Sequence, residues 1–411
     1  MISVTMSKSM TCKEILCDAD NLYGAYLVSI KGSKWKESTQ RFMLHFMRYI
    51  FLLKANLENQ TLVNGKPNEF FLSERGHIRP ITSIPLQDRI VRHDLVDNLL
   101  MPEVGKHIIY DNGASIKGRG IEFQRKRFEV HLRRYYKKHG NEGYILFGDF
   151  SKFYDNIVHE TAKRQFLDLF DDDEFLDWLL TVIFEAFRID VSYMSDEEFV
   201  ECMNGVFDKA SYRRIPKSEL AGKKWLEKSV NIGDQLSQVI GIFYPNRIDT
   251  YIKHVKSQKF YGRYMDDFYI MSPSKEELES MLDDIRDICR ELGIHLNEKK
   301  TKIVRMDKPF RFLQIRYTLT TDGKIHKRIN PKRVTAMRRR LKKLAVKANN
   351  NEINYENVEN TFKGWMGNFY KIMSRKQRQN MISLYEELFD KSVTIINKKM
   401  VITDKTDAEA A

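Results

Sequence analysis

The sequence has few of the features that mark secreted, membrane-spanning or zinc-stabilised proteins. Four cysteines in 411 residues, Cys12, Cys17, Cys202 and Cys289, are too few and too scattered for a disulfide framework or a paired zinc site. The sequence contains no run of 18 apolar residues, the length needed to span a membrane, and its N-terminal residues lack the apolar core of a signal peptide. We therefore expect a soluble, cytoplasmic protein with reduced thiols.

Chain-breaking features are also scarce. Nine prolines, no internal repeat and no long Pro/Gly/Ser linker indicate one continuous, multi-lobed body with soft boundaries. A hydrophobic fraction of 42% is enough for a real core. The formal net charge of +13 suits a polyanionic partner such as nucleic acid, although a well-solvated basic surface would carry the same charge.

Hydrophobic periodicity predicts an α+β order of elements in the first half of the chain. Residues 35–57 have helical spacing, and two short strands flank the turn at residues 74–77. A buried strand, Tyr144 to Phe147, runs into Asp149 and then into a helix. The polar, weakly periodic stretch 190–229 is interpreted as an insertion or mobile excursion.

The second half continues with alternating strands and helices. Residues 259–272 predict a hairpin with an acidic tip, and a helix at 275–293 follows. We expect one strand at 300–306, another at 310–319, and then a basic helical region with a polar tail. The order predicts an α+β fold with a central antiparallel sheet that carries acidic turns.

Three aspartates in these turns suit metal-dependent nucleotidyl transfer. Asp149 ends an apolar strand, and Asp266 and Asp267 lie in the tight hairpin. Joining a 3′-hydroxyl to a nucleoside triphosphate needs two divalent ions held by hard oxygen ligands. Each aspartate alone is more typical of a turn or a helix cap, but neighbouring strands would bring all three carboxylates together.

At these residues the sequence resembles reverse transcriptases. The tetrapeptide Tyr264-Met265-Asp266-Asp267 resembles their YxDD box, and GDFSKFYDNI (148–157) resembles their first catalytic motif. A Gly- and Ser-containing helix, LNEKKTKI (296–303) and FLQIRY (312–317) follow in family order, and the resemblance covers roughly residues 20–390.

The resemblance implies a set of metal ligands. Asp149 and Asp266 would bridge two Mg²⁺ ions, with Mn²⁺ as a substitute, and Asp267 would assist. The carbonyl of Phe150 would complete the shell of one ion. Lys300 would act as a general acid toward the leaving pyrophosphate or neutralise it, with Lys299 and Lys302 as competitors and a merely solvated lysine run as the simpler interpretation.

Further residues would bind the incoming nucleotide. Arg79 matches the family arginine that contacts the triphosphate, with Arg75 as a second candidate. Tyr154 falls where the family places its sugar-discriminating aromatic residue, although Phe153 and Tyr154 could both be core residues. The backbone amides of Lys152 and Phe153 could also bind the triphosphate.

One motif departs from the common family pattern. Where many members have Gln-Gly followed by Ser-Pro, this chain has Ile232-Gly233 followed by Ser237-Gln238, a form similar to diversity-generating retroelement and phage-defence enzymes of bacteria. The loss of the glutamine amide predicts low fidelity. Gln314 replaces the glycine of the usual primer grip. Asp88 and Arg89 are interpreted as a structural ion pair.

The family resemblance implies a right-hand polymerase. Residues 1–19 would be an N-terminal extension, 20–130 fingers, 131–318 a palm with its antiparallel sheet, 319–400 a helical thumb and 401–411 a polar tail. A thumb helix that follows a nucleic acid would bind the phosphate backbone through clusters of basic side chains. The same clusters could instead form a solvated helix face. The residues concerned are Arg338, Arg339, Lys342 and Lys343.

The implied activity is RNA-directed DNA polymerisation with an RNA template, dNTPs and a DNA product. No RNase H quartet or recognition domain is recognised, so a cognate noncoding RNA is expected to supply template specificity, in antiphage defence or in a diversity-generating element. Template-independent DNA synthesis and a non-catalytic, nucleic-acid-binding role also stay open. Binding of a protein partner or formation of a homo-oligomer also stays open. No membrane association is expected.

Overall fold

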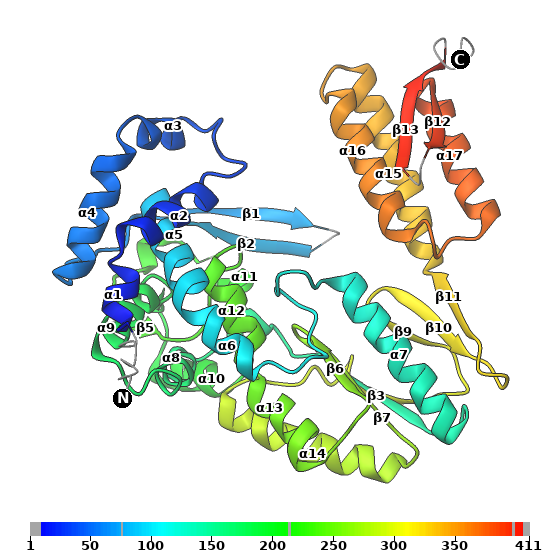
Figure 1. Ribbon diagram of the computed structural model, residues 1–411, viewed down its shortest axis with the longest axis horizontal. Coiled ribbons are helices and arrows are strands. Elements are labelled where there is room, and N and C mark those ends of the chain that lie inside the picture. The colour runs from blue at the N-terminus through cyan, green and yellow to red at the C-terminus, as the bar shows by residue number, and fades with distance from the viewer. Residues whose placement is uncertain (1–9, 75–76, 213–214, 397–398, 406–411) are drawn as a thin grey trace, which may run out of the picture. The chain divides into compact units, whose positions relative to one another are not determined.

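The structure, a computed structural model, describes residues 10–74, 77–212, 215–396 and 399–405 (Figure 1). The chain divides into two compact units, one of Met1–His131 with Tyr144–Ile303 and one of Leu132–Gly143 with Val304–Ala411. Among the described residues, no helix is both long and apolar enough to cross a membrane. The four cysteines are free thiols.

The first unit begins with short helices. The helix expected over residues 35–57 is divided in two, because His45 leaves helical geometry with φ −129°. Ile50, Leu53 and Leu57 form the buried stripe of the second of these helices. The four helices are α1 (Cys12–Leu16), α2 (Ala19–Ser29), α3 (Glu37–Leu44) and α4 (Phe46–Glu58).

An antiparallel hairpin follows, as the sequence predicts. Strands β1 (Asn68–Glu74) and β2 (His77–Ser83) pair with Leu72 opposite Arg79. The expected helical stretch after it forms α5 (Leu86–Asp94), which continues through a π-helical turn (Leu95–Leu100) into α6 (Met101–His107). The long basic helix α7 (Ile121–His139) comes next.

A four-stranded sheet has the strand order β6-β7-β3-β8. Its strands β3, β6 and β7 lie together in Figure 1. The predicted strand at 144–147, the hairpin at 259–272 and the helix at 275–293 are confirmed. The helix expected directly after Asp149 is instead a short 3-10 turn, Phe153–Asn156. Gly148 ends β3, and a side chain there would collide with the Phe268 ring, only 2.1 Å from the position of a Cβ atom. The strands are β3 (Tyr144–Gly148), β6 (Tyr261–Tyr264), β7 (Asp267–Ser272) and β8 (Lys302–Arg305).

Further helices of the first unit follow or separate these strands along the chain. The amphipathic helix α14 buries Leu278, Met281 and Ile285 and contacts β3 and β7. Asp234 caps α12 through its side chain, which accepts a hydrogen bond from the backbone N–H of Leu236. These helices are α8 (His159–Leu167), α9 (Glu174–Glu185), α12 (Gln235–Phe243), α13 (Asn246–Thr250) and α14 (Lys275–Leu292), with a π-helical turn at Tyr251–Val255.

The stretch 190–229, expected to be an insertion or a mobile excursion, forms short helices and strands in the part that the structure describes. Its polar surface hides a small apolar cluster of Ile189, Val191, Phe207 and Leu226, which holds the segment together. A capping box at Ser195 starts one of its helices. Its elements are β4 (Ile189–Asp190), α10 (Asp196–Asn204), α11 (Lys209–Tyr212), a 3-10 turn (Lys217–Glu219) and β5 (Trp225–Leu226).

Among the described residues, the second unit contains the C-terminal end of α7, two small sheets and three further helices. The single strand expected at 310–319 is instead a hairpin, because Leu313 and Gln314 both adopt positive φ angles, 40° and 75°. The expectation of a polar tail at 401–411 is also corrected. Residues 401–404 belong to the second strand of a C-terminal hairpin. The elements are β9 (Phe310–Phe312), β10 (Ile315–Leu319), β11 (Ile325–Ile329), α15 (Pro331–Asn349), α16 (Tyr355–Phe369), α17 (Arg375–Phe389), β12 (Lys391–Ile396) and β13 (Lys399–Asp404).

Candidate active site

Asp149 follows β3 directly, and its backbone is fixed on both sides. The carbonyl of Asp149 accepts a hydrogen bond from Asn297 N at 2.8 Å, and Ser151 N donates to the carbonyl of His295 at 2.7 Å. These two bonds fasten the segment after α14 onto the residues after β3. Asp149 is buried, with 5% of its surface exposed.

The hairpin of β6 and β7 brings the other two aspartates to the same edge of the sheet. Gly148 pairs with Phe268 across the antiparallel β3 and β7, so the next step of this register places Asp149 opposite Asp267. Tyr264 pairs with Asp267, and Met265 and Asp266 form the turn between the strands. The structure therefore gathers the three predicted carboxylates.

The pKa values of the two hairpin carboxyls reflect this crowding. Burial and then the charge of Asp149 raise the pKa of Asp266 to about 6. Burial, followed by the charges of Asp266 and Asp149, raises the pKa of Asp267 to about 7. Concentrated, partly desolvated negative charge of this kind is stabilised by a bound cation.

Lys300 supplies positive charge at this position. Its Nζ atom lies 2.9 and 2.8 Å from the two carboxylate oxygens of Asp149. Burial lowers the pKa of Lys300, but the hydrogen bond and charge of Asp149 outweigh that effect, so the pKa is raised. Of the three lysines considered from the sequence, Lys300 is the one seen to bind Asp149.

The three carboxylates offer the hard oxygen donors that Mg²⁺ prefers. Among the residues that the structure describes, no group of three His, Cys, Asp or Glu side chains is arranged as a ready-made metal site. In this structure Lys300 binds both carboxylate oxygens of Asp149.

Tyr154 lies beside the hairpin turn. It belongs to a 3-10 turn (Phe153–Asn156), and its hydroxyl contacts the Met265 sulfur at 3.8 Å. Gly241 of α12 packs against the same hydroxyl, and a Cβ atom at Gly241 would lie only 2.8 Å from it. Phe153 is buried in the core, whereas Tyr154 is only partly buried, and burial raises the pKa of its hydroxyl.

The Ile232 motif leads into α12. Gly233 has φ +103°, which a residue with a side chain rarely adopts, and Gln238 is exposed on the helix. Asp234 forms an ion pair with Arg92 at 3.0 Å, and both side chains are essentially inaccessible to solvent. The expected pair of Asp88 with Arg89 is not what forms, since Arg89 instead donates to backbone carbonyls.

Of the two arginines expected to contact the triphosphate, Arg79 and Arg75, only Arg79 lies among the described residues. Arg79 lies on β2, and its positive charge lowers the pKa of Asp266, opposing the effect of burial. It therefore acts on the carboxylates electrostatically. Arg75 lies outside the described residues.

The segment 189–230 contributes contacts that the sequence did not signal. The side-chain amide of Asn156 donates to the carbonyl of Phe207 at 3.1 Å, and Phe207 N donates back to Asn156 Oδ1 at 2.9 Å. Lys209 Nζ donates to Asn231 Oδ1 at 2.8 Å. Lys152 forms an ion pair with Asp208 at 3.2 Å, so part of its charge is already matched.

The basic residues predicted to bind nucleic acid share one helix in the second unit. Met337, Leu341 and Leu344 of α15 are buried, while the basic side chains between them are exposed. Helical periodicity therefore gives α15 one apolar and one basic face. The exposed basic residues are Arg338, Arg339, Lys342 and Lys343.

Comparison with known families gives one match. A family model described as reverse transcriptase (RNA-dependent DNA polymerase) matches residues 65–317, which is more than half of the chain. The matched range contains Arg79, Asp149, Lys300 and the hairpin aspartates. A search of curated proteins finds no match.

Proposed function

Because the chain belongs to the reverse transcriptase family and is therefore an RNA-directed DNA polymerase, we propose that Asp149, Asp266 and Asp267 form its catalytic centre. The observation that carries this proposal is the meeting of the three carboxylates at one edge of the central sheet. Family members generally use divalent metal ions. Bound Mg²⁺ would activate the 3′-hydroxyl and stabilise the leaving pyrophosphate.

The protein side chains have separate tasks in this proposal. Asp149 and Asp266, with the carbonyl of Phe150, would hold the metal ions, and Asp267 would complete the negative site. Lys300, which pairs with Asp149, would face the pyrophosphate, to which its ammonium group can donate a proton. Arg79 binds the triphosphate through its guanidinium group.

Nucleotide selection is assigned to the residues around Tyr154. The Tyr154 ring is held between the hairpin turn and Gly241, so it forms a rigid surface against which a sugar can pack. A 2′-hydroxyl would collide with that surface, so deoxynucleotides are preferred. The backbone at Lys152 and Phe153, together with Ile232, Gly233 and Gln238, completes the nucleotide site.

Templated synthesis distinguishes this proposal from untemplated nucleotide addition. The test is primer extension on two heteropolymeric RNA templates of different sequence, with Mg²⁺ and all four dNTPs, and with a lane without template. The proposal predicts products complementary to each template. Equal products in all lanes would indicate template-independent synthesis, and RNA binding without any product would indicate a non-catalytic binding protein.

We also propose a structured cognate RNA as template, bound in part by the basic face of α15. Charge supports this, because a net charge of +13 and exposed Arg338, Arg339, Lys342 and Lys343 suit a phosphate backbone. Sequencing of RNA that copurifies with the chain tests the proposal. One enriched, structured RNA is expected, and its loss in a variant with the four residues changed to Gln would assign the contact.

For the biological setting we propose antiphage defence. Supporting it is the folded segment 189–230, which enlarges the enzyme beyond a compact polymerase. Cells that express the chain should form fewer plaques than cells with an Asp266→Ala, Asp267→Ala variant. Equal plaque counts combined with mutagenesis of a neighbouring repeat gene would favour a diversity-generating element instead.

A further inference from the structure

Arg263 is a fully buried guanidinium next to the catalytic hairpin turn. Its Nε and Nη2 atoms donate to the carboxylate of Asp249 in α13 at 2.9 and 2.6 Å, and neither side chain has exposed surface. The hydroxyl of Tyr261 also donates to Asp249. A buried ion pair contributes little net stability, because desolvation of both charges opposes their attraction. Stability alone therefore does not account for this pair.

The other hydrogen bonds of Arg263 point to a role at the active site. Its Nη1 atom donates to the carbonyl of Met265 at 3.0 Å, and Nη2 donates to the carbonyl of Ile242 at 2.7 Å. Met265 has φ +55°, a strained conformation for a residue with a side chain, and it immediately precedes Asp266. One planar group thus holds the strained turn.

The second carbonyl connects the turn to the nucleotide side of the site. Ile242 lies in the last turn of α12, next to Gly241, which packs against the Tyr154 hydroxyl. The guanidinium of Arg263 therefore links the turn that carries Asp266 to the helix that supports Tyr154. A lysine in place of Arg263 could not reach three acceptors from one rigid plane.

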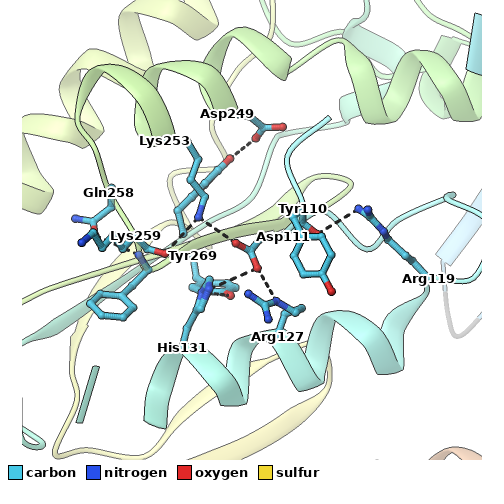
Figure 2. A network of polar contacts seen from close by, with 12 residues as sticks. Tyr110, Asp111, Arg119, Arg127, His131, Asp249, Lys253, Gln258, Lys259 and Tyr269 are labelled. Atoms are coloured by element: carbon cyan, nitrogen blue, oxygen red, sulfur yellow. Dashed lines mark hydrogen bonds and ion pairs between the residues drawn. The ribbon is translucent and has the colours of Figure 1, made fainter. Parts of the chain in front are cut away.

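The outer edge of β6 is held by a separate polar network. Arg263 N donates to the carbonyl of Asp111 at 3.1 Å. The carboxylate of Asp111 accepts hydrogen bonds from Arg127 at 2.7 Å and from Lys253 at 3.0 Å, and His131 lies 3.5 Å away (Figure 2). Both the side chain and the backbone of Arg263 are thereby fixed.

We propose that Arg263, oriented by Asp249, is a positioning residue that sets the place of the Asp266 carboxylate relative to Asp149 and Tyr154. The inference rests on the proposed catalytic role of Asp266. It assigns to Arg263 no contact with substrate. Its loss therefore lowers kcat and weakens metal binding, while the KM for dNTP changes little.

The test compares the full-length chain with three variants. Arg263→Lys keeps the charge but not the fork. A triple variant, Arg263→Met with Asp249→Leu and Tyr261→Phe, removes all three buried polar groups and so leaves no stranded charge. Arg286→Lys is the matched control, because it makes the same change at a guanidinium in exposed ion pairs with Asp283 and Glu298.

Two readouts are recorded for each folded variant: kcat and KM for primer extension, and the Mg²⁺ concentration that gives half of the metal-induced rise in Tm. Arg263→Lys and the triple variant should lose kcat by roughly tenfold to a hundredfold, as expected for a misplaced catalytic group. Their Mg²⁺ midpoint should rise severalfold. Arg286→Lys should match the wild type in both.

Wild-type kcat and an unchanged Mg²⁺ midpoint in the folded triple variant would overturn the proposal. Should the triple variant fail to fold, the same result in Arg263→Lys would overturn it. A wild-type chain without primer extension would refute the proposed function instead. In that case the Mg²⁺ midpoints decide the positioning role by themselves, and equal midpoints contradict it.

Discussion

The Nζ atom of Lys300 lies 2.9 and 2.8 Å from the two carboxylate oxygens of Asp149. In the proposed function, these are the oxygens that Asp149 would offer to a metal ion. Lys300→Met should therefore lower the Mg²⁺ concentration needed for the metal-induced rise in Tm. It should also reduce kcat by about a hundredfold or more, because a general acid is lost.

Lys299→Met is the control for this prediction, since Lys299 is exposed and has the same chemistry. It should resemble the wild type in both measurements. A Lys300→Met enzyme that needs more Mg²⁺ than the wild type would show that Lys300 assists metal binding rather than competing with it.

The raised pKa values of Asp266 and Asp267, about 6 and about 7, predict a pH-dependent stability. Without metal, the folded state holds these protons more tightly than the unfolded state. The contribution of these protons to the free energy of unfolding is thus fully present below about pH 4 and is lost as the pH rises through 6 to 7. Mg²⁺ should therefore raise the Tm more at pH 8 than at pH 5.5.

The check is Tm against pH, with and without Mg²⁺, for the wild type and for Asp266→Asn, Asp267→Asn. In this double variant both the metal effect and the extra pH dependence should disappear. A Mg²⁺ effect equal at both pH values would mean that the carboxyls do not titrate in this range.

The contacts of Tyr154 with Met265 and Gly241 predict control of sugar selection by its ring. Tyr154→Ala should increase the incorporation of ribonucleotides relative to deoxynucleotides, on the order of 10- to 200-fold, the range that small steric differences produce. Competition between dCTP and CTP in single-nucleotide extension measures this ratio. Tyr154→Phe keeps the ring and should retain discrimination. A Tyr154→Ala enzyme with unchanged discrimination would assign the ring to the core.

Ile232 occupies the position of the usual glutamine, which predicts low fidelity. Ile232→Gln should reduce misincorporation, because an amide would again contact the new base pair. Sequencing of complementary DNA made from a defined RNA gives the error rate. Val200→Gln, the same kind of change at an exposed position of α10, serves as the control and should leave the error rate unchanged. A misincorporation rate in the wild type equal to that of Ile232→Gln would contradict the hypothesis.

The buried ion pair of Arg92 and Asp234 predicts a large stability effect. Arg92→Met should lower the free energy of unfolding by about 3 to 5 kcal/mol at pH 8, because it strands a buried carboxylate. Burial raises the pKa of Asp234, so lower pH should ease the loss by protonation. Urea unfolding at pH 5.5 and pH 8 measures the loss of stability and its dependence on pH. Addition of Asp234→Asn should recover most of the stability, and no recovery would contradict the assigned pair.

Local sequence patterns predicted the elements that carry the candidate site. The strand before Asp149 is a short apolar run, and the hairpin at Asp266 alternates around a tight acidic turn, so periodicity was sufficient. The break between β9 and β10 was missed because Leu313 and Gln314 adopt positive φ without the glycine that usually marks such a turn. Their conformation comes from tertiary packing.

Long-range polar contacts were also beyond sequence reasoning. Lys209 meets Asn231 across 22 positions, and Arg92 meets Asp234 from a helix much earlier in the chain. Neither separation along the chain corresponds to a sequence motif or to a helix or strand period. A lysine or arginine in a polar stretch looks solvated until folding shows its partner, and two of the apolar residues that hold segment 189–230 together, Phe207 and Leu226, are too widely spaced to form a periodic pattern.

The most direct test of the central claim is single-turnover primer extension on RNA with Asp149→Asn, Asp266→Asn and Asp267→Asn, each compared with Asp283→Asn. Asp283 makes an exposed ion pair on α14, so its variant controls for the chemical change itself. Our account predicts loss of extension in Asp149→Asn and Asp266→Asn, a strong reduction in Asp267→Asn, and normal extension in Asp283→Asn. Full extension by Asp149→Asn or Asp266→Asn would contradict it.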